Sequence, residues 1–101
     1  MQQQAFEQPK STLVIYGVTE DGKKFRPSDW AERLCGHLST FRNRRIYFSR
    51  LLRPAVRDGI KCVIVEPELA VEHPKIYQLV CDFATTNRLP MRPLASNEVN
   101  R

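Results

Sequence analysis

The sequence predicts a two-layer α+β domain in which a mainly antiparallel sheet of four or five strands carries two helices on one face. Short runs of β-branched and aromatic residues alternate with two segments of helical hydrophobic spacing, and two Asp-Gly pairs indicate turns. The expected order is β-β-α-β-β-α with a possible last strand. A split β-α-β arrangement of the ferredoxin-like kind stays open as an alternative, because these patterns do not determine strand order.

The first half of the domain is expected to contain a hairpin and a helix. Residues 13–18 are rich in β-branched and aromatic side chains, and Asp21-Gly22 supplies a turn into a short return strand at 24–26. Ser28 is the expected cap of a helix over 29–39. The apolar residues on one face of this helix are Trp30, Ala31, Leu34, Cys35 and Leu38.

The second half is expected to contain two strands, a helix and a short final strand. Residues 45–49 and 60–65 have strand composition, and Pro54 either ends the first of these strands or places it at a sheet edge. A helix begins at Pro74 and ends near residue 88, because its apolar residues recur at helical spacing. Residues 89–91 add a possible edge strand.

Gly36, inside the first helix, is expected to mark close packing against the sheet.

The length and composition of the chain favour one domain. The 101 residues include 42% hydrophobic and 27% charged side chains, which is typical of a globular domain. We expect the folded domain over residues 11–91 and mobile tails at 1–10 and 92–101. Three cysteines at wide spacing do not form a disulfide framework and predict reduced, buried thiols. Together with the lack of a signal sequence or membrane span, this predicts a cytoplasmic protein.

Residues 42–57 are the one strongly biased segment, with six arginines and no acidic residue. Strand alternation would place Arg45, Tyr47 and Arg53 on one face. Arginine suits phosphate oxygens and an aromatic ring can stack on an unpaired base, so this segment is a candidate single-strand contact. The favoured alternative is a solvated edge hairpin whose charge opposes strand pairing between molecules. The candidate contact residues are Arg44, Arg45, Tyr47, Arg50, Arg53 and Arg57.

Two other sets of residues are candidates for a surface that binds a protein partner. Arg26, Asp29 and Arg33 surround the start of the first helix, although helix capping and an Asp29–Arg33 pair explain them more simply. Both faces of the strand at 60–65 are apolar, whereas two helices cover only one. We expect Val63 and Val65 to lie on the uncovered face, which a tail or a second copy in a homodimer would then cover.

No combination of residues in the sequence indicates catalysis. Cys35 and His37 are two residues apart on the expected helix, so their side chains point apart and cannot act as nucleophile and base. The Cys and His spacings do not match a metal site, and the glycines do not form a phosphate-binding loop. We therefore expect a non-enzymatic protein-binding or adaptor module without cofactor or metal. Nucleic-acid binding through residues 42–57 is the alternative.

Two strings of residues resemble a known family. They are FRPSDWAERLCG, which begins at Phe25, and GIKCVIVE, which begins at Gly59. Together with an Arg-aromatic strand between them, they are similar to a small proteobacterial cytoplasmic domain family of unknown function. The resemblance covers most of residues 12–91 and implies a compact α+β fold. It implies no activity, cofactor or catalytic residue.

Overall fold

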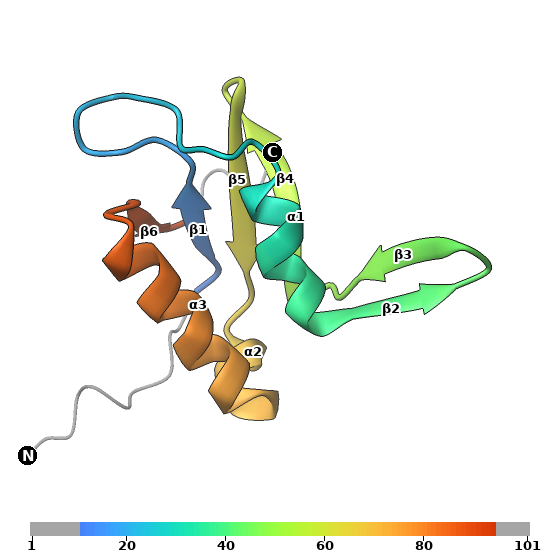
Figure 1. The fold of residues 1–101 in the computed structure, drawn as a ribbon. Coiled ribbons are helices and arrows are strands. Elements are labelled where there is room, and N and C mark those ends of the chain that lie inside the picture. The colour runs from blue at the N-terminus through green and yellow to red at the C-terminus, as the bar shows by residue number, and fades with distance from the viewer. Residues whose placement is uncertain (1–10, 95–101) are drawn as a thin grey trace, which may run out of the picture.

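A four-stranded antiparallel sheet is the centre of the computed structural model, which describes residues 11–94 (Figure 1). The expected tail at 1–10, and that at 92–101 from residue 95 onward, lie outside these residues. The strands in sheet order are β4 (Leu52–Arg57), β5 (Ile60–Val65), β1 (Leu13–Tyr16) and β6 (Met91–Pro93). Every neighbouring pair is antiparallel. The strand β6 thus ends two residues beyond the expected domain boundary at residue 91.

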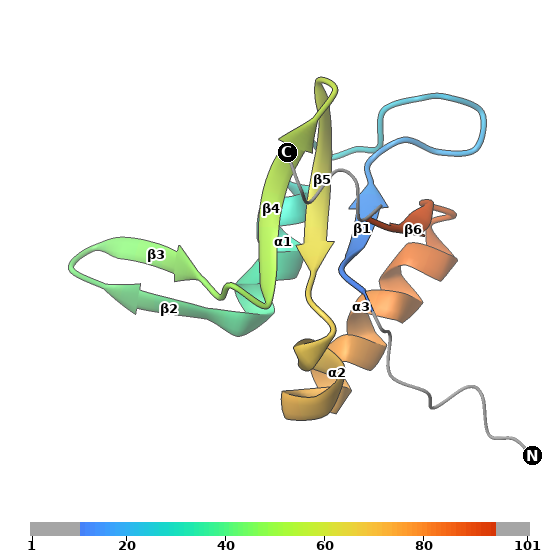
Figure 2. The ribbon, with the colours of Figure 1, turned by 180° about the vertical axis from the view of Figure 1, so that it is seen from behind.

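The helices α1 (Trp30–Cys35) and α3 (Pro74–Thr86) lie on one face of this sheet, and the view from behind shows the strands in front of them (Figures 1 and 2). This confirms the predicted two-layer α+β architecture. A short helix α2 (Glu68–Glu72), which the sequence did not predict, precedes α3 at one end of the sheet. As expected, Pro74 occupies the first turn of α3, where its missing N–H removes no hydrogen bond.

A second sheet of two strands projects from this body. It consists of β2 (Ser39–Arg42) and β3 (Arg45–Phe48), and both views show it pointing away from the helices and the main sheet (Figures 1 and 2). We call residues 39–48 the arm. The strand β2 was not predicted, because the first helix was expected to reach residue 39. Instead α1 ends at Cys35, a 3-10 turn η2 (Gly36–Leu38) follows, and the Ser39 hydroxyl donates to the carbonyl of Gly36 at 3.0 Å.

The main core lies between the sheet and the helices, and it contains Val63 and Val65 with no exposed surface. The expectation that these valines form an uncovered partner surface is wrong. Alternation does divide the strand into two apolar faces, but the helices cover the face that carries the valines. The opposite face holds a smaller buried cluster of Val14, Cys62 and Ile64, with Leu94 packed against it.

The expected return strand at 24–26 is replaced by a wide loop. Only Val18 and Lys24 form a strand-like bridge, and the Phe25 N–H donates to the Gly17 carbonyl at 2.9 Å. The Phe25 ring turns inward and meets Trp30 edge-on, with ring centroids 5.8 Å apart. The loop therefore follows the packing of this ring rather than a second strand ladder. Helix α1 begins after Asp29, and Ser28 does not cap it.

The strand β4 was not predicted as a separate strand, since Pro54 was expected either to end the strand at 45–49 or to place that strand at a sheet edge. The structure places Pro54 within β4 at the edge of the sheet, where its lack of an N–H is tolerated. Asp58 and Gly59 join β4 to β5 with φ angles of 55° and 76°. Two positive φ values are typical of the type I′ turn that suits a tight hairpin.

Candidate functional site

The tip of the arm concentrates positive charge. Arg42 and Arg45 are directly opposite each other across the two strands, and Asn43 and Arg44 form the turn between them. Like charges at facing positions destabilise a strand pair. The turn residues have φ angles of 50° and 66°, and the left-handed region costs a residue such as Arg44 roughly 1–2 kcal/mol. The arm thus keeps an arginine at a position where glycine would be more stable.

The two faces of the arm differ in chemistry. Directly opposed residues share a face, so Phe41 and Ile46 lie on one face. These two side chains are 70% and 57% exposed, which is unusual for large apolar groups. Tyr47 lies on the other face with the opposed arginines, and the Arg42 guanidinium carbon is 5.3 Å from the centre of its ring. One face is therefore apolar and the other is basic and aromatic.

Phe41 was not among the predicted site residues, because the biased segment was taken to begin at Arg42. Its signal was present in the sequence, since Ser-Thr-Phe-Arg has strand composition next to the arginines. The apolar residues up to Leu38 also have helical spacing, so the predicted helix was extended to residue 39 and this strand was not recognised. Only the pairing of β2 with β3 shows that this ring belongs to the arm.

The predicted continuous basic face stops at the base of the arm. The Ser49 hydroxyl accepts a hydrogen bond from the Leu51 N–H at 3.0 Å, and the Ser49 carbonyl accepts one from the Leu52 N–H at 3.2 Å. This turn ends the strand and redirects the chain into β4. Leu51 is buried as a result, with 5% of its surface exposed. The alternation of side chains between the two faces of a strand therefore does not extend from Tyr47 to Arg53.

The remaining candidate arginines belong to the body of the protein and not to the arm. Arg53, in β4, pairs with the Glu66 carboxylate at 2.9 Å and also donates to the Arg50 carbonyl. Arg50 is exposed in the turn at the base of the arm, and Arg57 lies at the far end of β4, opposite Ile60. The structure thus brings together Arg44, Arg45 and Tyr47 and adds Arg42 to them. It does not join Arg53 or Arg57 to that group.

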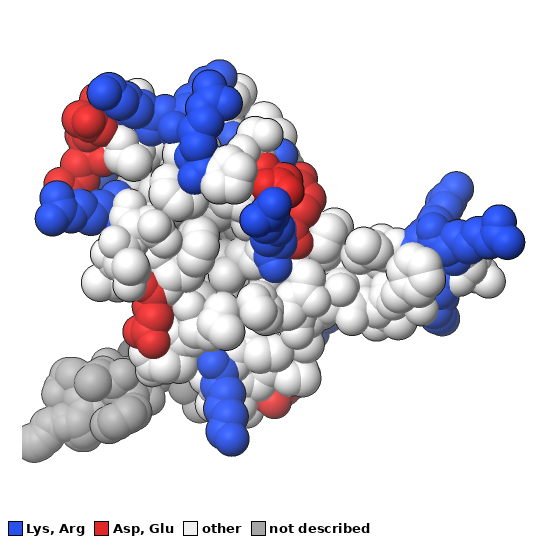
Figure 3. All heavy atoms as spheres, in the orientation of Figure 1, with Lys and Arg blue, Asp and Glu red and all other residues white. Residues whose placement is uncertain are grey.

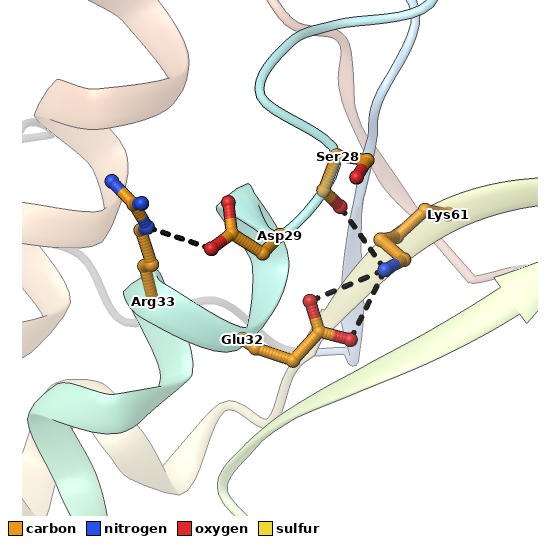
Figure 4. Close-up of polar contacts among 5 residues, drawn as sticks. All are labelled: Ser28, Asp29, Glu32, Arg33 and Lys61. Carbon is orange, nitrogen blue, oxygen red and sulfur yellow. Dashed lines mark hydrogen bonds and ion pairs between the residues drawn. The ribbon is translucent and has the colours of Figure 1, made fainter.

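Of the candidates around α1, Asp29 and Arg33 form an ion pair within the start of the helix, whereas Arg26 is exposed in the preceding loop and forms no ion pair within residues 11–94. Arg33 pairs with Asp29 at 2.9 Å on one side of the helix (Figure 4). On the other side the Lys61 ammonium, from β5, lies 3.1 Å from the Glu32 carboxylate and donates to the Ser28 carbonyl at 3.0 Å. The simpler interpretation of the Asp29–Arg33 pair is the one that the geometry supports.

The distribution of charge distinguishes the arm from the body. Figure 3 shows Lys and Arg atoms gathered at the end of the arm with no acidic atoms among them, whereas acidic and basic atoms are mixed over the body. The sequence explains this difference, because no acidic residue occurs between Glu32 and Asp58. On the face that Figure 3 presents, the arm is therefore the surface where charge of a single sign is most concentrated.

The thiols have the environment of core side chains. Cys35 and Cys62 are buried, Cys81 is partly buried, and all three are free. Burial raises the pKa of the Cys35 thiol to about 12, and the Glu32 carboxylate adds to this effect. Burial also raises the pKa values of Cys62 and Cys81. Because the thiolate is the reactive form, these groups are poorly suited to nucleophilic chemistry.

Comparisons with known proteins identify a family. Residues 9–94 match the family model described as "Protein of unknown function (DUF3579)". A solution structure described as the first structural representative of its family is 34% identical over 86% of this chain and 82% of the other, with a TM-score of 0.75. No curated protein matches the chain. None of the helices within residues 11–94 is long and apolar enough to cross a membrane. The family match covers most of the chain, and the protein therefore belongs to the DUF3579 family.

Proposed function

We propose that the protein is a non-enzymatic cytoplasmic binding module whose arm binds single-stranded nucleic acid. The observation that carries this proposal is the tip of the arm, where Arg42 faces Arg45 across the strand pair and Arg44 occupies a left-handed turn position. Both features cost stability in the free protein. A chain of phosphates between the guanidinium groups would neutralise this repulsion, because each group can donate in a bidentate manner to phosphate oxygens.

The apolar face of the arm favours a nucleic acid over a purely acidic protein partner. Phe41 is 70% exposed beside Ile46, three residues from the turn arginine. Phe41 lies on the face opposite Arg42 and Arg45, so a single strand that passes over the tip of the arm would stack an unpaired base on this ring and place its phosphates at the arginines. Tyr47, which was the predicted stacking residue, has the Arg42 guanidinium over its ring. We therefore assign base stacking to Phe41.

The test is a fluorescence anisotropy titration with labelled single-stranded RNA and DNA and with a duplex of the same length. Single strands should bind more tightly than the duplex. If Arg42, Arg44 and Arg45 each neutralise one phosphate, the log–log slope of affinity against salt should be about −2 on single strands. Failure to bind any strand at low salt with tens of micromolar protein would refute the proposal.

Variants identify the contact surface. Arg45→Glu should abolish binding and leave the melting temperature unchanged or slightly higher, because it replaces a repulsive cross-strand pair with an attractive one. Phe41→Ala should weaken single-strand binding by roughly 5- to 150-fold, the range for loss of one stacked base. Lys75→Glu, an exposed charge reversal on α3, is the matched control and should leave affinity within about twofold. Equal binding of polyglutamate would instead indicate an acidic protein partner.

A further inference from the structure

A cavity of about 180 Å³ lies between the loop that joins β1 to α1 and the adjoining end of β5. Its apolar lining includes Phe25, Trp30 and Ile60, and Gly17 forms part of its wall. Figure 3 shows basic atoms at this upper end of the body, over the β1–α1 loop of Figure 1. The cavity is separate from the arm, and it raises the question of which ligand it would accept.

The first indication is the indole N–H of Trp30. This residue is only 3% exposed, and its ring stacks on Phe83 with 10° between the ring planes. The edge of the ring that carries Nε1 lies against Gly17, since a Cβ at that position would be 2.8 Å from Nε1. Within residues 11–94 this N–H has no hydrogen-bond acceptor. Nε1 is not among the fully buried polar atoms that lack a partner, so solvent reaches it, and Trp30 gives the lining of the cavity a donor that a ligand can use.

The second indication is the charge around the opening. Lys24 and Arg26 line the cavity, are exposed, and form no ion pair within the described part of the chain. Lys61 also lines it, but its charge is offset by Glu32 at 3.1 Å. Two uncompensated cations beside an unused N–H donor favour an anionic group at this position. Among residues 11–94, no carboxylate lines the cavity to compete for them.

We propose that this cavity binds a small organic carboxylate with an apolar body about the size of one ring. Its carboxylate accepts from Trp30 Nε1 and pairs with Arg26 and Lys24, while its body contacts Phe25 and Ile60. The volume suits such a molecule, because a cavity of about 150 Å³ holds one benzene ring. This site does not depend on nucleic-acid binding by the arm.

The chain offers a direct probe, because Trp30 is its single tryptophan and gives one indole N–H signal in a ¹⁵N–¹H correlation spectrum. Titration with benzoate should shift this signal saturably, with a dissociation constant below about 1 mM. Benzamide, which has the same shape without the charge, should bind at least tenfold more weakly. The proposal is overturned if 10 mM benzoate leaves the signal in place, or if benzamide binds equally well.

Substitutions locate the anion within the cavity. Arg26→Gln and Lys24→Gln should each weaken benzoate binding about three- to tenfold, and the double variant should weaken it further. Both side chains are exposed on the loop, so the folded spectrum should persist. Lys75→Gln, which removes the same charge from α3, is the control and should bind benzoate as the unmodified protein does. Equal loss of binding in this control would attribute the effect to net charge and contradict the assignment.

Discussion

At the scale of single residues, Gly17 is the position where the backbone is least tolerant of a side chain. An added Cβ would lie 2.7 Å from Trp30 Cζ2 and 2.9 Å from the backbone carbonyl oxygen of Lys61. The Lys61 oxygen cannot move freely, because it accepts the Gly17 N–H at 2.9 Å. The absence of a side chain at this position allows an edge of the indole to lie against the backbone directly after β1.

Gly17→Ala is therefore expected to destabilise the protein by roughly 1–3 kcal/mol, the usual cost of overpacking a filled site. Gly36→Ala is the matched control. Gly36 has ordinary helical angles and open space around the added Cβ, so alanine there should be neutral or stabilising by up to about 1 kcal/mol. Urea unfolding of both variants measures the difference. A Gly17→Ala protein as stable as the unmodified one would contradict the packing described.

These two glycines show what the sequence could predict at this scale and what it could not. The helical spacing correctly identified Trp30 and its buried neighbours. It also led to the expectation that Gly36 packs closely against the sheet, which is wrong, because Gly36 lies at the exposed end of α1. Close packing at Gly17 depends on a ring from another element. A contact between two different elements cannot be predicted from local sequence patterns.

At the scale of elements, the arm is the part of the fold least supported by the rest. A two-stranded hairpin is at best marginally stable in water without packing against other elements. The arm is joined to the body mainly near its base, where Phe48 is half-buried against the main core. Its outer residues, including Phe41 and Ile46, are exposed. The free energy needed to open the arm should therefore be much smaller than that needed to unfold the main sheet.

Amide hydrogen exchange tests this difference. The N–H groups that join β2 to β3 are expected to exchange at least 100-fold faster than those that join β1 to β5, because local opening of the arm leaves the core intact. Single-stranded nucleic acid should slow exchange in the arm if the proposed function holds. Uniform protection of both sheets in the free protein would show that the arm unfolds only with the body.

The elements differ in how well the sequence predicted them. Residues 60–65 and the helix from Pro74 were predicted almost to their ends, because each is strongly patterned and lies in the core. The strand at 45–48 was also predicted, but not its partner. That partner is β2, and the Ser49 turn then frees residues 52–57 to pair with β5 instead. Which strands pair is a non-local property, and short segments of similar composition do not determine it.

At the scale of the whole molecule, the main prediction that failed concerned which sheet face the helices cover. Alternation showed that β5 is apolar on both sides, which is correct. The choice between the faces depends on the direction in which the chain leaves the sheet. Both α1 and α3 return to the side of Val63 and Val65. A homodimer or a protein partner therefore stays a prediction. The face of Val63 and Val65, which first suggested it, is covered by the helices.

The buried titratable groups predict how the stability of the whole domain responds to pH. Burial raises the pKa of Cys35 from 9.0 to about 12 and that of Tyr77 from 10.0 to about 12. The folded chain therefore retains protons that the unfolded chain loses as the pH rises above 9. The unfolded state then binds fewer protons, and stability falls with increasing pH between about 9 and 12.

Urea unfolding at pH 7.5, 9 and 10.5 should show this as a fall in the midpoint that is small up to pH 9 and larger between pH 9 and 10.5. Cys35→Ala removes the most strongly shifted thiol, so the fall should be smaller in this variant even if its stability at pH 7.5 is lower. The same thiol should react slowly with a labelling reagent until denaturant is added, as should Cys62. A stability that stays constant up to pH 10.5 would show that these groups titrate equally in both states.

The neighbouring positions of β1 and β6 have a consequence for redesign of the chain. Leu13 is paired with Pro93, and the Leu94 N–H donates to the Thr12 carbonyl at 2.8 Å. The two ends of the folded body thus lie side by side on adjacent strands. A short linker from residue 94 to residue 11 could close the chain, and new ends could be opened between Asn43 and Arg44 at the exposed turn. The circular permutant would keep every strand of the main sheet while dividing the arm into two separately tethered strands.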